Sequence, residues 1–161
     1  MTATVAQDAR PPLALIRMMN PVLRAILPTP LGRVVRPFAL LEFHGRRSGH
    51  LLRVPVGWHR TESGDVVITP AAWRGNFGSS IPVTVFHRGV RHDLIGTLDT
   101  DPAHVAAELQ SLMDRHGSLG RVGIKAPRGH RVTQRDVEAL DRAVIHFEPA
   151  PLASRRRAAP T

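Results

Sequence analysis

Residues 38–60 read FALLEFHGRRSGHLLRVPVGWHR, and they carry the clearest fold signal in the chain. Two largely apolar runs, 38–44 and 51–60, flank a short loop rich in glycine, arginine and serine. Runs of this length, bounded by such residues, are typical of β-strands. The sequence therefore predicts two strands joined by a basic loop.

The strand pattern continues downstream of this pair. Glycine, proline or polar residues bound each further run, and hairpin turns are expected at 62–65 and 88–91. Residues 73–77 have room for no more than one helical turn. The additional strands are predicted at 65–70, 82–88 and 91–98.

Helical signals follow the strands. Residues 101–116 have apolar side chains on one face, with Asp101 placed to cap the helix and a glycine placed to end it. Thr133 and Asp136 have the spacing of a capping box, which predicts a second helix at 134–142.

A last strand at 143–148 completes the expected order of elements. Together they predict an α+β protein, a five- or six-stranded, mainly antiparallel barrel with helices outside it. We expect a helical N-terminal arm at 1–36, a barrel domain at 37–149 and a disordered basic tail at 150–161.

Composition excludes several classes of protein. The 161 residues suit one domain, and the absence of cysteine excludes disulfide scaffolds, zinc ribbons, iron–sulfur clusters and thiol nucleophiles. The histidines lack metal-ligand spacing, so no metal site is predicted. The net charge of +9 is concentrated in the arm and the tail, and only 4% of residues are aromatic. Both features disfavour nucleic acid as a partner.

The N-terminal arm is unusually apolar. Apolar residues in 13–26 cover most of a helical circumference, with Arg17, Asn20 and Arg24 in one polar stripe. Asn20–Pro21 is expected to end one short helix and begin another. The arm could pack on the barrel or on a second subunit, or contact a membrane surface peripherally. No signal peptide or membrane-spanning segment is predicted, so we expect a cytoplasmic protein, with the inner face of the membrane as the alternative.

The basic loop between the first two strands is the best candidate for chemistry. Gly45 and Gly49 allow tight backbone geometry and close approach of backbone amides to an anion. Arg46, Arg47 and Ser48 supply charge and hydrogen bonds for a phosphate or carboxylate. From composition alone, an ordinary solvated turn remains the alternative.

The same loop, followed by an Arg-Val-Pro-Val strand at 53–56, resembles the deazaflavin-dependent nitroreductase family. Its members are split β-barrel proteins that use coenzyme F420. Further segments agree in the same order along the chain, so that the resemblance covers roughly residues 32–149. These segments are Val56-Gly57-Trp58, the hairpin at 62–65, Val66-Val67-Ile68, the Trp73–Phe77 turn and Pro82-Val83-Thr84-Val85.

The resemblance implies an α+β split barrel that works as an F420H2-dependent oxidoreductase. A hydride would pass from the reduced deazaflavin to a small-molecule acceptor, a quinone, nitroaromatic or similar compound. The basic loop and Arg53 would hold the cofactor's phosphate and acidic tail, while Trp73 and Asn76 would line or position its ring. A homodimer with the cofactor cleft near the interface is also implied. The implied cofactor-binding residues are Gly45, Arg46, Arg47, Ser48, Gly49, Arg53, Trp73 and Asn76.

Departures from the family pattern leave alternatives open. The chain has no tyrosine and lacks the Lys-Gly-Gly-type segment of many relatives, so no catalytic residue is assigned. His44 and His50 are the nearest candidate proton donors, and Arg142 is expected to be an ordinary surface residue. FMN or haem could replace F420 on the same barrel. The non-enzymatic alternative is a basic module that binds an anionic membrane or nucleic acid.

Overall fold

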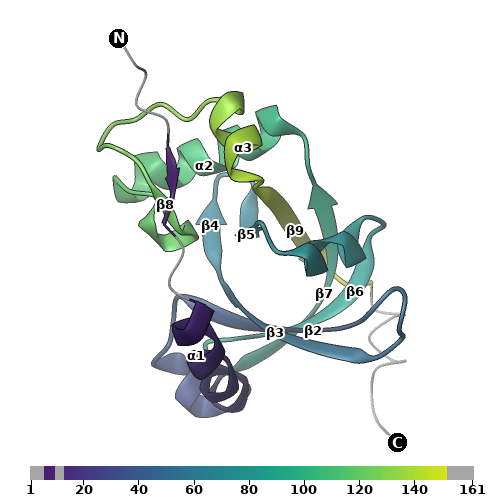
Figure 1. The fold of residues 1–161 in the computed structure, drawn as a ribbon. Helices are drawn as coiled ribbons and strands as arrows, with labels where there is room; N and C mark the ends of the chain where they lie inside the picture. The colour runs from purple at the N-terminus through teal and green to yellow at the C-terminus, as the bar shows by residue number, and fades with distance from the viewer. Residues whose placement is uncertain (1–5, 10–12, 152–161) are drawn as a thin grey trace, which may run out of the picture.

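A curled antiparallel sheet forms the centre of the computed structural model, which describes residues 6–9 and 13–151 (Figure 1). Its strand order is β3-β2-β6-β7-β9-β5-β4, and every neighbouring pair is antiparallel. The sheet curves into a half-barrel (Figure 1). Its strands are β2 (Phe38–His44), β3 (Leu51–Gly57), β4 (His59–Thr61), β5 (Gly64–Thr69), β6 (Ile81–His87), β7 (Val90–Asp99) and β9 (Ala143–Pro149).

The two edges of this sheet are consecutive pieces of chain. Only Trp58 separates β3 from β4, and its backbone N–H donates to the Pro37 carbonyl at 2.8 Å. The chain then leaves β2 and pairs with β5, where His59 lies opposite Val66. The predicted strand at 51–60 is therefore divided at Trp58, because the chain changes its pairing partner there.

Alternation along the strands sends apolar side chains to both faces. Leu41 and Phe43 of β2 pack in the concave interior, whereas Leu40 faces the N-terminal helix. On β5, Val67 points inward and Val66 packs against the helices that cover the other side. A sheet buried on both faces explains why these runs are almost continuously apolar.

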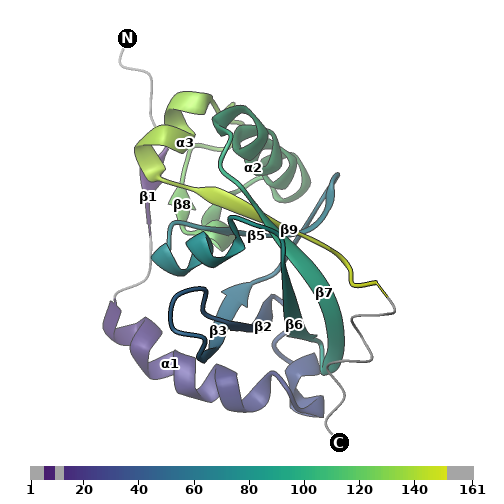
Figure 2. The same cartoon turned by 90° about the vertical axis from the view of Figure 1, so that its right-hand side faces the viewer.

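Helices cover two sides of the sheet. The helix α1 (Leu13–Ile26) lies along one side, and α2 (Pro102–His116) and α3 (Gln134–Leu140) lie on the other (Figure 2). Three short 3-10 turns complete the chain: η1 (Pro30–Arg33), η2 (Ala72–Phe77) and η3 (Gly120–Val122). A separate antiparallel pair, β1 (Gln7–Asp8) with β8 (Ile124–Lys125), was not expected from the sequence.

The predicted caps are confirmed. Asp101 accepts hydrogen bonds from the backbone N–H groups of Ala103 and His104, and Gly117 ends α2 with φ of 68°. Thr133 and Asp136 form the capping box of α3. All predicted strands are present, with ends within three residues of those expected.

The predicted break at Asn20–Pro21 is wrong, because α1 continues through Pro21. Proline removes one backbone hydrogen bond, and the packing of Leu23 and Leu27 against Leu40 holds the segment after Pro21 on the sheet. Leu23 and Leu27 of the arm therefore pack on the barrel, which is one of the three alternatives for the arm. No described helix is long and apolar enough to cross a bilayer.

The predicted tail begins with two described residues. Ala150 is buried, and its backbone N–H donates to the Asp93 carbonyl at 3.2 Å. Ala150 therefore extends the packed part of the chain beyond β9. The prediction of disorder for the rest of the tail falls on 152–161, outside the described residues.

Candidate functional site

The basic loop is held in a tight conformation by its own backbone. The Gly45 N–H donates to the His50 carbonyl, and the Gly49 N–H donates to the Gly45 carbonyl, both at 2.8 Å. Gly49 has φ of 68°, and a Cβ on Gly45 would lie 2.8 Å from the Ser48 hydroxyl. The left-handed backbone at Gly49 favours glycine, whereas a side chain at Gly45 would require only the Ser48 hydroxyl to move.

The turn η2 is anchored to the core by Phe77 and to the end of α3 by Arg74. Phe77 is fully buried in the concave core, in edge contact with Phe43 at 4.8 Å between ring centroids. The Arg74 guanidinium donates to the carbonyl and the carboxylate of Asp141 at 2.7 and 2.8 Å. This turn is therefore a rigid platform.

Asn76 joins the loop to that platform. Its Oδ1 accepts a hydrogen bond from the Arg46 backbone N–H at 2.8 Å, and its Nδ2 donates to the Trp73 carbonyl at 2.8 Å. Two segments thirty residues apart, which the sequence analysis assigned to one site, are thus in direct contact.

A cavity of about 470 Å³ lies between the loop and η2, and we call it the loop cavity. Two arginines line it, and none of the described residues that line it is acidic. The backbone N–H groups of Arg47 and Ser48 donate to no other described residue. The lining residues are Gly45, Arg46, Arg47, Ser48, Leu52, Ala72, Gly75 and Asn76.

Two predicted site residues lie elsewhere. Arg53 is absent from the lining of the loop cavity, and its Nε donates to the Glu42 carboxylate across the β2–β3 pair at 2.7 Å. Alternation along β3 explains the difference, since Leu52 takes the inward position and Arg53 the opposite one. Trp73 packs its half-buried ring against Phe43 at 6.1 Å and does not line the cavity.

The two candidate proton donors also lie outside the loop cavity. His44 and His50 are exposed, and neither is among the lining residues.

The prediction that Arg142 is an ordinary surface residue is wrong. Its side chain is buried and donates to the carbonyls of Leu140 and Gly123 at 2.9 and 3.1 Å, so it joins structural elements instead of facing solvent.

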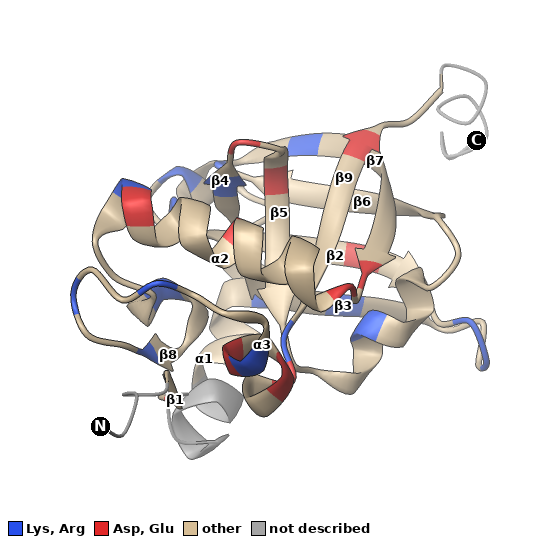
Figure 3. Cartoon of the chain, turned by 90° about the horizontal axis from the view of Figure 1, so that it is seen from above, with Lys and Arg blue, Asp and Glu red and all other residues tan. Residues whose placement is uncertain are grey.

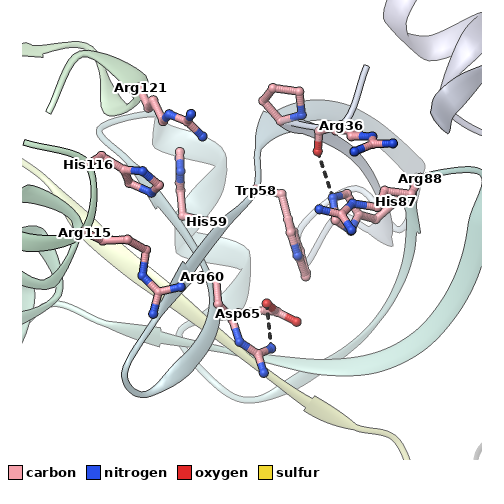
Figure 4. Close-up of a pocket in the computed structure, with 11 residues that line it drawn as sticks. Arg36, Trp58, His59, Arg60, Asp65, His87, Arg88, Arg115, His116 and Arg121 are labelled. Atoms are coloured by element: carbon pink, nitrogen blue, oxygen red, sulfur yellow. Dashed lines mark hydrogen bonds and ion pairs between the residues drawn. The ribbon is translucent and has the colours of Figure 1, made fainter. Parts of the chain in front are cut away.

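A second and larger cavity, of about 610 Å³, escaped the sequence analysis (Figure 4). We call it the Trp58 cavity. It lies at the end of β2 opposite the basic loop, and Lys and Arg positions gather along β4 and the loops beside it (Figure 3). The lining residues are Arg36, Pro37, Trp58, His59, Arg60, Asp65, His87, Arg88, Arg115, His116 and Arg121.

Three histidines of the Trp58 cavity are held neutral. Burial, with Arg121 and His116 nearby, lowers the pKa of His59 to about 4. Burial also lowers the pKa of His87 and, together with Arg121, that of His116. At neutral pH the positive charge of this cavity therefore comes from its arginines.

Neither comparison with known proteins nor a search for metal-ligand clusters assigns a further function to the described residues. Within 6–9 and 13–151, no group of three or more His, Cys, Asp or Glu side chains is arranged to hold a metal ion. No protein-family model matches the sequence, and no curated protein matches it either.

Proposed function

We propose that the protein is an F420H2-dependent oxidoreductase on a split β-barrel, with the loop cavity as the site for the cofactor's phosphate. The observation that carries the proposal is the pair of hydrogen bonds through Asn76, which brings the basic loop onto η2. Those are two of the segments on which the family resemblance rests.

The residues at the loop cavity fit an anionic group. Arg46 and Arg47 supply positive charge, and the N–H groups of Arg47 and Ser48, which have no acceptor among the described residues, supply backbone donors. A Cβ on Gly75 would meet no atom within 4 Å, so the platform leaves its side of the cavity open. The volume of about 470 Å³ is sufficient for a phosphodiester and part of an attached chain.

Each residue has a role that follows from its position. Arg46 and Arg47 bind the phosphate, and Asn76 positions the loop without being a catalytic residue. When bound, a reduced deazaflavin would supply a hydride to a quinone, nitroaromatic or similar acceptor. Such chemistry belongs to the cofactor, so the chain needs to bind, orient and shield it from water. Since neither His44 nor His50 lines the cavity, we assign any proton for the acceptor to solvent.

A titration with F420, followed by its fluorescence, tests this proposal. We expect saturable binding to the wild type, and a dissociation constant roughly tenfold or more higher for the Arg46→Ala/Arg47→Ala variant, because two charge-assisted contacts are lost. Arg135→Ala is the matched control, since Arg135 is exposed on α3.

The outcomes of that titration discriminate among the cofactors. Parallel titrations with FMN and haem use the same three proteins. Tighter binding of FMN or haem than of F420 would replace the proposed cofactor. Equal F420 affinities of the double variant and the control would remove the loop cavity from the site.

A further inference from the structure

The Trp58 cavity is spatially separate from the proposed cofactor site. Arg36 precedes β2 and the basic loop follows it, so the length of β2 lies between the two cavities. Seven residues of extended strand span about 20 Å. A phosphate group bound in one cavity therefore does not contact the arginines of the other.

Most of the positive charge that lines the Trp58 cavity has no carboxylate partner among the described residues. Of its five arginines, only Arg60 has a carboxylate partner among the described residues, Asp65 at 2.9 Å. The other four come from four different parts of the fold and line the same cavity around Trp58 (Figure 4). They are Arg36 before β2, Arg88 between β6 and β7, Arg115 at the end of α2 and Arg121 on η3.

A buried, unpartnered imidazole faces the same space. His59 is only 6% exposed and lines the cavity, yet its ring makes no hydrogen bond to any described residue. Its ring nitrogens are not among the sealed, unpaired polar atoms of the described residues, so they are open to water or to a ligand in the cavity. Since burial keeps the pKa of His59 low, the neutral ring can donate one N–H to an anion.

Backbone geometry at Arg88 adds independent support. Arg88 and Gly89 have φ of 53° and 74°, the conformation of a two-residue hairpin turn that favours Asn, Asp or Gly at both central positions. Arginine is unusual there, and such strain is commonly kept where a side chain has a function. The strained position places the Arg88 guanidinium at the cavity rim beside His87.

A simpler explanation covers only part of this cluster. Arg115 and His116 lie in the last turn of α2, where positive charge offsets the helix dipole. Arg36, Arg88 and Arg121 lie on other elements and gain nothing from that dipole. These exposed arginines, gathered on a hollow surface with Asp65 as the one carboxylate among its described lining residues, favour an anionic ligand.

We propose that the Trp58 cavity binds a phosphorylated small molecule that carries two or more negative charges. Its phosphate oxygens would bind Arg36, Arg88 and Arg121, with His59 donating a hydrogen bond. The half-buried indole of Trp58, 4.8 Å from the Phe147 ring, supplies an apolar wall for the organic part. About 610 Å³ suits a ligand of nucleotide size.

Calorimetric titration with pyrophosphate and ATP tests this proposal, with adenosine as the uncharged control. We expect wild type to bind both anions with dissociation constants below about 1 mM, and adenosine more weakly. The Arg36→Ala/Arg121→Ala variant is expected to bind at least roughly tenfold more weakly. The Arg46→Ala/Arg47→Ala and Arg135→Ala variants are expected to retain wild-type affinity.

Arg88→Asn separates binding from folding. Asparagine suits the turn, so this variant is expected to melt at or above the wild-type temperature while binding ATP roughly fivefold or more weakly.

Absence of saturable binding of pyrophosphate and ATP by the wild type would overturn the proposal. Loss of binding in the Arg46→Ala/Arg47→Ala variant alone would assign the anions to the loop cavity instead. Binding only of a long polyanion such as poly(U), with a steep salt dependence, would replace it by a nucleic-acid surface.

Discussion

The Asn76 side chain joins two segments of the candidate site. Both ends of its carboxamide are used, one for the Arg46 backbone and one for the Trp73 carbonyl. The residue was predicted to line or position the cofactor ring; it lines the loop cavity, and its contacts connect the two segments that form that cavity. The sequence identified Asn76 as a candidate site residue, whereas its hydrogen-bond partners depend on the fold.

At the same scale, His59 makes stability depend on pH. Its pKa is lowered from 6.5 to about 4 by burial, with Arg121 and His116 nearby, so the unfolded chain binds a proton before the folded one does. Its contribution is complete above pH 6.5 and is lost as pH falls toward 4, by about 3 kcal/mol. Chemical denaturation between these pH values is expected to show a smaller loss for His59→Leu than for the wild type.

His104 is the matched control for that measurement. Its pKa is raised by the Asp99 carboxylate, so its removal cannot reduce a loss of stability on acidification. His104→Gln should therefore lose at least as much stability as the wild type. An unchanged pH dependence in His59→Leu would show that this imidazole is not held neutral by the fold.

At the scale of elements, α3 is joined to distant segments through one carboxylate. Asp136 is buried and accepts hydrogen bonds from the Thr133 backbone and hydroxyl, from His130 and from the Ala6 backbone. Although burial by itself raises the pKa of this carboxyl, the hydrogen bonds lower it below its usual value. The capping box thus also holds the chain's first described residues.

Asp136→Asn is expected to lower the free energy of unfolding by about 2 kcal/mol. An amide offers one acceptor oxygen where the carboxylate offers two, so at least one buried donor loses its partner. Urea denaturation measures the change, with Asp114→Asn on the exposed face of α2 as control. Equal stabilities of the two variants would show that Asp136 acts as a local cap with no wider role.

Local signals explain which elements could be predicted. Caps, turn glycines and apolar runs specify β2, α2 and α3, because each depends on residues close in sequence. The path of α1 through Pro21 and the division of the strand at Trp58 depend on packing and on a change of pairing partner. Neither is visible in the local pattern.

On the scale of the whole molecule, the same distinction applies to the two cavities. The loop cavity was anticipated because a family resemblance linked its two segments. The Trp58 cavity was missed because Arg36, His59, Arg88 and Arg121 are far apart in sequence and meet only when the sheet curls. Curvature, which no short motif encodes, creates this second candidate site.

The N-terminal segment also carries a prediction about assembly. Val22 and Val34 are 55% and 81% exposed, and Met19 and Leu31 are exposed nearby in the chain. A homodimer would cover such side chains, so light scattering after gel filtration is expected to give twice the chain mass for the wild type. Val22→Asp/Val34→Asp is expected to be monomeric, and Leu51→Asp, also exposed, dimeric.

A different result would assign the exposed segment to another partner. A wild type that is monomeric but sediments with anionic vesicles would contradict the homodimer and favour the peripheral membrane contact. A dimer that survives the double substitution would place the interface elsewhere.

The central claim is that the loop cavity holds the phosphate of a deazaflavin that donates a hydride, and oxidation of F420H2 by a quinone tests it most directly. Absorbance of the oxidised cofactor reports the rate for wild type, Arg46→Ala/Arg47→Ala and Arg135→Ala. We expect turnover by the wild type and the control, and a kcat/KM for F420H2 roughly tenfold or more lower in the double variant. A wild-type rate no faster than the uncatalysed reaction, or a double variant as fast as the wild type, would contradict the claim.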